Sequence, residues 1–214
     1  MAFAKRAIDW PDSHRLQHRK RAPPLTIIDQ IIDTFHRNGD ALYDGGEVVT
    51  QSQHALQAAY FAESEGKSDT LIAASLLHDY GHVIDAAENS VDQESDRHHE
   101  LVGSKFLERH FASAVTEPGK LHVAAKRYLC AVEDDYFGRL SPVSVKSLEL
   151  QGGPFTAKQV KAFEKNQHYK DAIQVRRYDE RAKDPNLVTP DFAHYCKYLA
   201  AGLFESTQTT RQSP

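Results

Sequence analysis

The hydrophobic residues of this chain recur every three or four positions over most of its length, which is the spacing of one face of an α-helix. The pattern is clearest from Ile27 to Phe35, after which Asn38 and Gly39 end the segment. Further helical patterns cover residues 48–65, 70–77, 99–111, 119–129, 142–149, 156–164, 169–179 and 190–204. Alternating runs typical of β-strands are nearly absent. The pattern therefore predicts an all-α fold.

One of these segments, residues 70–77, is almost wholly apolar, as expected for a helix buried at the centre of the fold. It leads directly into His78 and Asp79. Gly81 follows two residues later and is expected to let the chain turn away. The sequence therefore predicts that a histidine and an aspartate stand at the end of a buried helix.

The helical patterns lie within one predicted domain, residues 25–204, which is large enough to bury a core of its own. Residues 1–24 end in two prolines and are interpreted as a flexible N-terminal arm. Residues 88–96 are acidic and lack periodicity, which predicts a surface loop, and residues 205–214 are expected to form a disordered tail.

Composition and charge exclude several classes of protein. The chain has 214 residues and a formal net charge of -4, so we expect no nucleic-acid partner. No apolar run approaches the length of a membrane-spanning helix, and the first residues lack the apolar stretch of a signal peptide. Only two cysteines occur, Cys130 and Cys196, and they form no C-x-x-C motif. We therefore expect a cytoplasmic protein with no membrane partner, of unknown oligomeric state.

Several histidines and aspartates are spaced in a way that suits two metal ions. The candidate ligands are His54, His78, Asp79, His99, His122 and Asp179. They offer nitrogen and oxygen atoms without a thiolate, which favours iron or manganese over a structural zinc ion. Asp79 has two carboxylate oxygens and could bridge two ions while His78 binds one of them. The sequence therefore predicts a dinuclear metal centre.

Two cations accompany the predicted ligands at helical spacing. Lys126 follows His122 by four residues, and Arg176 precedes Asp179 by three, so each cation shares a helix face with a ligand. Arginine binds phosphoryl oxygens through two parallel hydrogen bonds, whereas lysine acts as a point charge. This arrangement predicts an anion site beside the metals, with a phosphoryl or phosphonyl group as its ligand.

These motifs resemble those of the HD-domain superfamily in its dinuclear form, because the series H…HD…H…H…D occurs on a helical chain. The chain most resembles the HD-domain phosphonate oxygenases, which cleave carbon–phosphorus bonds. The resemblance is carried by HVAAKRYL (122–129), LELQGGP (148–154) and VRRYDE (175–180), with support from LLHDYGH (76–82) and YDGGE…QHALQ (43–57). It covers residues 26–203 and implies an HD-domain helical bundle within residues 25–204.

The resemblance implies a mixed-valent Fe(II)/Fe(III) pair that is bridged by Asp79. The other ligands would be His54, His78 and Asp179 for one iron, and His99 and His122 for the other. Lys126 and Arg176 would hold the phosphonate group of the substrate. Ser147 and Gln151 are further candidates for polar contacts with the substrate.

The resemblance also implies a gating segment at residues 43–47. Tyr43 would ligate iron in the resting site and withdraw when substrate binds, while Glu47 would face the ammonium group of the substrate. His82 would lie near the substrate in the second sphere of the metals. The segment has one more residue than the family pattern and an added acid, Asp44, which could adjust the pocket to a different amine.

The expected reaction uses O2 to cleave the carbon–phosphorus bond of 1-hydroxy-2-aminoethylphosphonate or its N-trimethyl counterpart, giving phosphate and glycine or glycine betaine. Three alternatives stay open. One is an HD-type metal-dependent phosphohydrolase acting on a nucleotide or small phosphate ester, which the two cations would serve equally well. The others are a metal-dependent sensor without turnover and an inositol-oxygenase-type reaction on a polyol.

Overall fold

The structure is a computed structural model, and it describes residues 25–43, 48–85 and 103–204. Within these residues the regular elements are helices, and the only β-type pairing is two isolated bridges, Leu42 with Thr50 and Phe111 with Leu203. The predicted all-α fold class is confirmed. The expectations for residues 1–24, 88–96 and 205–214 fall outside the described residues.

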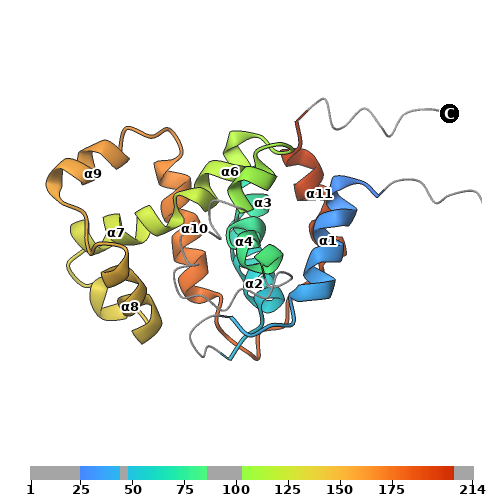
Figure 1. The fold of residues 1–214 in the computed structure, drawn as a ribbon, viewed down its shortest axis with the longest axis horizontal. Coiled ribbons are helices and arrows are strands. Elements are labelled where there is room, and N and C mark those ends of the chain that lie inside the picture. The colour runs from blue at the N-terminus through green and yellow to red at the C-terminus, as the bar shows by residue number, and fades with distance from the viewer. Residues whose placement is uncertain (1–24, 44–47, 86–102, 205–214) are drawn as a thin grey trace, which may run out of the picture.

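Figure 1 shows the arrangement of the helices along the chain. They are α1 (Ile27–Asn38), α2 (Gln51–Ser64), α3 (Asp69–Leu77), α4 (Tyr80–Asp85), α6 (Ser113–Lys120), α7 (His122–Val132), the 3-10 helix η2 (Phe137–Arg139), α8 (Pro142–Leu150), α9 (Ala157–Phe163), α10 (Tyr169–Arg181) and α11 (Phe192–Gly202). Residues 103–107 are also helical. None of the helices in the described part of the chain has both the length and the apolar character needed to cross a membrane.

Local side-chain chemistry determines where several helices begin. The hydroxyl of Thr50 accepts a hydrogen bond from the Gln53 backbone N–H, and the Gln53 side chain accepts one from the Thr50 N–H. This reciprocal capping box satisfies two backbone donors that the first turn of a helix leaves unpaired. Thr26 and Thr156 form the same motif at α1 and α9. The box at Thr50 bears on the predicted site because it starts α2, which carries the predicted ligand His54.

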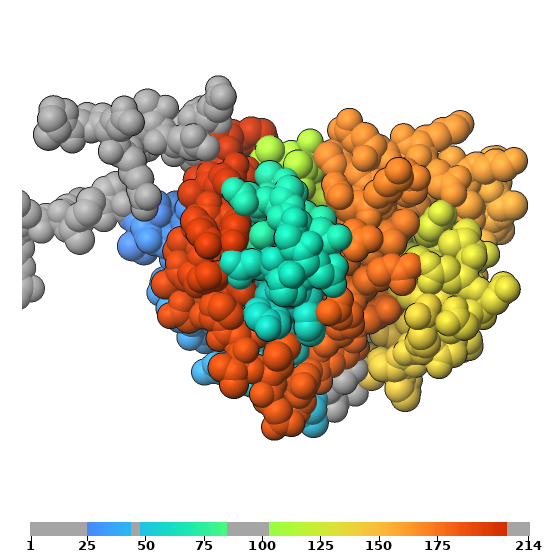
Figure 2. Space-filling view, turned by 180° about the vertical axis from the view of Figure 1, so that it is seen from behind, coloured from blue at the N-terminus to red at the C-terminus, as the bar shows by residue number. Residues whose placement is uncertain are grey.

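α3 lies at the centre of the bundle, as its apolar sequence predicts. It packs against α2, α6, α10 and α11, and Ala73 and Leu76 on it are fully buried. Seen from behind in Figure 2, the teal surface at the end of α2 and the beginning of α3 lies between the red surface of α11 and the orange surface of the chain that includes α10, while residues 71–77 of α3 are buried beneath the surface. Because α3 is enclosed on these sides, the residues that follow it enter the interior of the protein.

The helices α7, α8 and α9 form an extension on one side of the bundle (Figure 1). α7 packs against both α9 and α10, and a small second core of Ala125, Phe163 and Ala172 lies where these helices meet. α10 also contacts α2, α3 and α6. It therefore links the extension to the central bundle, and the predicted site residues on α7 and α10 lie along this link.

The sequence pattern missed the helix α6 and misjudged the extent of the helical segment before it. Residues 113–120 form α6, although Pro118 and Gly119 are strong breaker signals in the sequence. The described part of the segment expected at 99–111 is helical only over residues 103–107, because Phe111 leaves the helix and pairs with Leu203. α6 packs against α3 and α10, and Phe111 pairs with Leu203 after the end of α11, and local periodicity does not report either contact.

The expectation that the chain turns away at Gly81 is wrong. Gly81 lies inside α4, a short helix that the sequence pattern did not predict. Gly103 packs closely against the backbone of Gly81, and a Cβ atom on Gly103 would lie 2.6 Å from the Gly81 nitrogen. Gly103 is therefore required by the close contact between these two helical segments, and Gly81 lies within a helix and not at a turn.

Candidate metal centre

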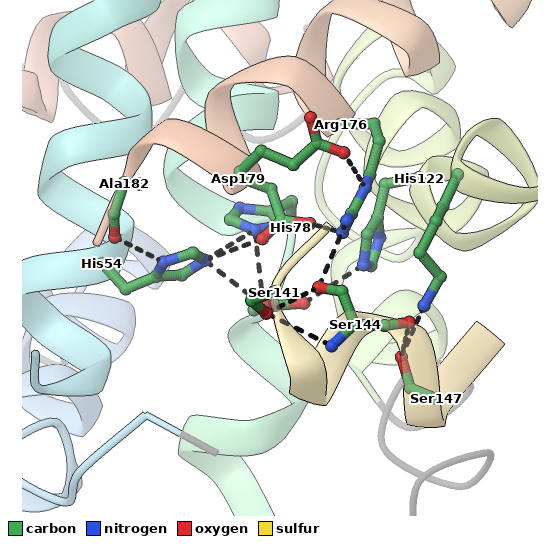
Figure 3. A network of polar contacts seen from close by, with 12 residues as sticks. His54, His78, His122, Ser141, Ser144, Ser147, Arg176, Asp179 and Ala182 are labelled. Carbon is green, nitrogen blue, oxygen red and sulfur yellow. Dashed lines mark hydrogen bonds and ion pairs between the residues drawn. The ribbon is translucent and has the colours of Figure 1, made fainter. Parts of the chain in front are cut away.

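Four of the predicted metal ligands converge at the centre of the molecule. His54 comes from the first turn of α2, His78 and Asp79 from the junction of α3 and α4, and Asp179 from α10. Their ligand atoms all lie within 4.8 Å of one another, and the four side chains are buried. His122, the first residue of α7, joins them with its Nε2 3.5 Å from Asp79 Oδ1. Elements far apart in sequence thus bring five candidate ligands to one point (Figure 3).

The three imidazoles share one orientation that leaves a lone pair facing the centre. In each of them Nδ1 lies within hydrogen-bonding distance of a backbone carbonyl oxygen. The pairs are His54 with Ala182 at 2.8 Å, His78 with Ser75 at 2.8 Å, and His122 with Gly119 at 2.5 Å. A carbonyl only accepts, so Nδ1 carries the proton, and in the neutral ring Nε2 is a free ligand atom.

The distance between two of these nitrogens indicates a bound cation. Nε2 of His54 and Nε2 of His78 are 3.1 Å apart, and both carbonyl-bonded rings offer a lone pair there. Two lone pairs at this distance repel each other unless a proton or a metal ion lies between them. The donor set and its geometry therefore fit a metal ion.

The carboxylate of Asp79 divides its two oxygens between different histidines. Oδ2 lies 3.3 Å from His78 Nε2 and 3.5 Å from His54 Nε2. Oδ1 lies 3.5 Å from His122 Nε2. Asp179 is on the Oδ2 side, since its Oδ1 is 3.5 Å from His54 Nε2. One oxygen thus faces the His54, His78 and Asp179 group and the other faces His122, which is the arrangement that a bridging carboxylate needs.

Electrostatics favours positive charge at this point. Burial would raise the pKa of Asp79, but His78 and His54 outweigh it and hold that pKa well below its usual range. Burial would lower the pKa of His78, but the adjacent Asp79 raises it to about 9. The pKa of His122 is lowered, mainly because its ring is buried. The site therefore keeps its carboxylates ionised and attracts a cation. In the metal-free protein this cation is a proton on His78.

The hydroxyl of Tyr43 reaches the same point. It lies 3.1 Å from Asp79 Oδ2 and 3.3 Å from Asp179 Oδ1, and its ring stacks on His54 with 3.8 Å between centroids. Burial, with the nearby charges of Asp179 and Asp79, raises the pKa of the phenol well above its usual value. The Tyr43 hydroxyl is therefore protonated and lies beside both carboxylates. The gating role of Tyr43 stays a prediction.

The two predicted cations border the cluster from the side of the extension. Lys126 is buried one turn after His122 on α7, and its Nζ donates to Ser147 Oγ on α8 at 2.6 Å. Gln151 follows Ser147 by one turn, and its Oε1 is buried without a hydrogen-bond partner among the described residues. Lys126 and Ser147 thus join α7 to α8, Gln151 lies at the end of α8, and the contacts of all three with a substrate stay predictions.

Arg176 is more strongly paired than its sequence position suggests. Its guanidinium donates to Asp179 Oδ2, to Glu180 Oε1 at 3.0 Å, to the hydroxyl of Tyr136 at 3.2 Å and to Ser144 Oγ at 3.4 Å. The side chain is buried, and the hydroxyl of Tyr136 in turn donates to Glu180. Arg176 therefore orients a predicted metal ligand and is itself held by Glu180 on α10, by Ser144 on α8 and by Tyr136 in the turn before η2.

His82 faces a pocket next to the cluster. The pocket is lined by His78, Asp79 and His82 together with apolar residues that include Leu107 and Val115. His82 thus shares a space with two predicted ligands, and its second-sphere role remains a prediction. The predictions for His99, Asp44 and Glu47 fall on residues outside the described part of the chain.

Sequence reasoning missed three residues that hold Arg176. Glu180 follows Arg176 by four residues, a spacing that signals an ion pair on one helix face. Ser144 precedes the predicted Ser147 by one turn of α8, so helical spacing could also have revealed it. Tyr136 gives no local signal, because its contact with Arg176 joins residues 40 positions apart.

Comparison with known proteins gives the chain a family. It is 45% identical over 170 residues to a [1-hydroxy-2-(trimethylamino)ethyl]phosphonate dioxygenase (glycine-betaine-forming) of Leisingera caerulea, covering 79% of this chain and 86% of that protein. It is 42% identical over 174 residues to a hydroxymethylphosphonate dioxygenase of Gimesia maris, covering 80% of this chain and 86% of that protein. An uncharacterized protein of Acanthamoeba polyphaga mimivirus is 29% identical over 183 residues, with 84% and 83% covered. No protein-family model matches the chain. The two named relatives share the same chemistry, and the chain belongs to the family of hydroxyphosphonate dioxygenases.

Proposed function

We propose that this protein is an O2-dependent diiron oxygenase that cleaves the carbon–phosphorus bond of a 1-hydroxyphosphonate. Its substrate would be 1-hydroxy-2-aminoethylphosphonate or the N-trimethyl counterpart, and its products phosphate with glycine or glycine betaine. The observation that carries the proposal is the 45% identity to a dioxygenase that forms glycine betaine from the trimethylated compound. A second dioxygenase relative, at 42% identity, also acts on a hydroxyphosphonate.

The overall reaction balances without a further reductant. One 1-hydroxyphosphonate and one O2 contain the same atoms as one carboxylic acid and one phosphate. The carbon–phosphorus bond and the C1–H bond break, C1 is oxidised to the carboxyl level, and O2 accepts the four electrons. The proposal therefore requires a centre that reacts with O2 and a site that holds the phosphonate beside it.

The metal centre would be a pair of iron ions, Fe(II) and Fe(III). His54, His78 and Asp179 would hold one ion, and His122 would hold the other together with His99. Asp79 would bridge them, which its two differently directed oxygens support. When bound, the pair supplies Lewis acidity toward the substrate hydroxyl and electrons toward O2.

The phosphonate would be bound by the cations of the extension. Lys126 is buried and its Nζ is oriented by Ser147, so its charge acts in a site that contains little water. Arg176 still has N–H groups beyond those that its protein partners use, since a guanidinium carries five donors. Together the two side chains would neutralise the phosphonate, while Gln151 would offer an acceptor to a substrate hydroxyl or ammonium group.

Tyr43 would control access to the metal. Its hydroxyl lies between Asp79 and Asp179, where an incoming substrate oxygen would bind. Movement of Tyr43 out of this position would leave both carboxylates and the metal open to the substrate. We propose that Asp44 and Glu47, which follow in the chain, then face the amine.

Aerobic phosphate release from iron-loaded protein tests the function. We expect equal amounts of phosphate formed and O2 consumed with one of the two aminoethyl substrates. Hydroxymethylphosphonate serves as a third substrate that has no amine, and activity on it alone would contradict the assignment of a cationic substrate. Phosphate release from a phosphate ester without O2 would instead indicate the phosphohydrolase alternative, which the named relatives do not support.

A further inference from the structure

The turn that follows α8 is held by an arginine that the proposed mechanism does not use. Gly152 and Gly153 have φ angles of +94° and +70°, a conformation that favours glycine. Arg127, on α7, donates from Nε to the Gly153 carbonyl at 2.7 Å and from Nη2 to the Gly152 carbonyl at 3.2 Å. One guanidinium group therefore binds both carbonyls of the turn.

The same arginine also holds the chain beyond the turn. Its guanidinium carbon lies 4.7 Å from the centre of the Phe155 ring, within the range of a cation–π contact. The backbone N–H of Phe155 donates to the backbone carbonyl of Arg127 at 3.1 Å. Arg127 thus fixes residues 152–155 through its side chain and its main chain. A planar, forked guanidinium can make these contacts together, whereas the point charge of a lysine cannot.

The helix anchored in this way carries the polar side chains that face the cations. Ser144, Ser147 and Gln151 follow one another at intervals of three and four residues, so they share one face of α8. Ser144 accepts a hydrogen bond from Arg176 and Ser147 accepts one from Lys126. The third residue, Gln151, ends this row with a buried oxygen that has no partner among the described residues. The row therefore ends in an acceptor that a bound ligand could satisfy.

We propose that Arg127 is a positioning residue of the phosphonate site, which anchors the end of α8 to α7 so that Ser147 and Gln151 stay in place against Lys126. The inference rests on the proposed function, because the site that Arg127 positions is the phosphonate site. Lys126 and Arg127 are adjacent on α7. One helix therefore carries both the cation and the residue that aligns its partner helix, and Arg127 itself does not touch the substrate.

Three variants separate positioning from simple stabilisation. Arg127→Ala removes all side-chain contacts with the turn, and Arg127→Lys keeps the charge but loses the fork. Arg181→Ala is the matched control, because the Arg181 guanidinium also stacks on an aromatic ring, at 4.1 Å from the centre of Phe61, and its contacts with Phe61, Tyr178 and Glu65 involve no predicted site residue. All three should retain the iron content of the wild type, since none of them replaces a predicted ligand.

Substrate affinity is the property that a positioning role changes. We expect Arg127→Ala and Arg127→Lys to raise KM for the hydroxyphosphonate by roughly ten- to a hundredfold with a smaller loss in kcat. Free guanidinium ion should lower the KM of Arg127→Ala toward the wild-type value. The affinity for methylphosphonate, an unreactive ligand measured by calorimetry, should fall by a similar factor. Arg181→Ala should keep wild-type KM and affinity.

The outcomes distinguish the inference from the proposed function. If wild-type protein binds methylphosphonate but releases no phosphate, the proposed reaction fails while the role of Arg127 can still be measured by affinity. If wild-type protein does not bind methylphosphonate, no phosphonate site exists to be positioned and the inference is overturned. It is also overturned if Arg127→Ala only lowers the melting temperature and leaves KM and the methylphosphonate affinity unchanged.

Discussion

At the scale of single residues, the site depends on how a few ligand atoms are oriented. Three backbone carbonyls direct Nε2 of His54, His78 and His122 toward the two oxygens of Asp79. These carbonyls also hold each ring in the tautomer that can bind a metal. The prediction of these residues as ligands rested on residue type and order, whereas the hydrogen bonds that orient them became visible only in the folded chain.

Replacement of Asp79 tests the proposed bridge. Asp79→Ala removes both oxygens that face the histidines. Loss of a residue that only hydrogen-bonds to a metal ligand lowers metal affinity by about ten- to a hundredfold. Loss of the bridging ligand itself should therefore lower the affinity for a metal pair by more than about a hundredfold. Metal content per chain measured by mass spectrometry after dialysis checks this. Asp135→Ala is the control, because Asp135 is 79% exposed and pairs only with Arg139 among the described ion pairs. Two retained irons in Asp79→Ala would contradict the bridge.

The raised pKa of His78 predicts that metal binding depends on pH. In the metal-free protein Asp79 raises the pKa of His78 to about 9 against the effect of burial, so a proton occupies the ring at neutral pH. A metal must displace that proton. The metal affinity should therefore rise by about tenfold per pH unit until the pH reaches about 9 and then level off. Competition with a chelator at several pH values measures it, and an affinity independent of pH below 9 would refute the assignment.

At the scale of elements, glycines permit the close packing around the site. The chain needs Gly103 because a Cβ there would stand 2.6 Å from the Gly81 nitrogen and 2.8 Å from its Cα. Gly119 on α6 is similar, since its Cβ would lie 3.1 Å from the His78 Cα. Local sequence patterns identify these residues as helix breakers. In the folded chain Gly103 lets residues 103–107 approach α4, and Gly119 lets α6 approach the predicted ligand His78.

A glycine substitution measures how much this close packing contributes to stability. Gly103→Ala should lower the free energy of unfolding by about 1–3 kcal/mol, because the added methyl group meets backbone atoms that cannot move aside. Gly138→Ala is the control, since its Cβ would meet nothing within 4 Å, and a change within about 0.5 kcal/mol is expected. Urea denaturation followed by circular dichroism gives both values. Equal stability of the two variants would show that the contact is not tight in solution.

At the scale of the whole molecule, the candidate metal centre takes its ligands from both parts of the fold that α10 links. Its candidate ligands come from α2, the α3–α4 junction, α7 and α10. These elements belong to both the central bundle and the extension formed by α7, α8 and α9 (Figure 1). A bound metal pair would therefore act as a link between the two parts and stabilise the folded chain.

Removal of the metal should lower the melting temperature. A ligand present at 100 times its Kd adds about 2.7 kcal/mol to the stability. For a domain of this size that corresponds to about 5–10 °C in the melting temperature. Calorimetry of iron-loaded protein with and without a chelator measures the shift. Asp79→Ala serves as the control because its melting temperature should not respond to the chelator, and an unchanged wild-type value would contradict the structural role of the metal.

The sequence by itself determined the fold class, the boundaries of most helices and the residue types of a metal and anion site. These properties depend on local periodicity and on spacings within one helix, as for His122 with Lys126 or Arg176 with Asp179. Only the tertiary structure decided which side chains meet, as in the contacts of Arg176 with Tyr136 and of Arg127 with the turn after α8. Such contacts depend on how helices distant in sequence pack together, and packing is a property of the whole chain that no local pattern contains.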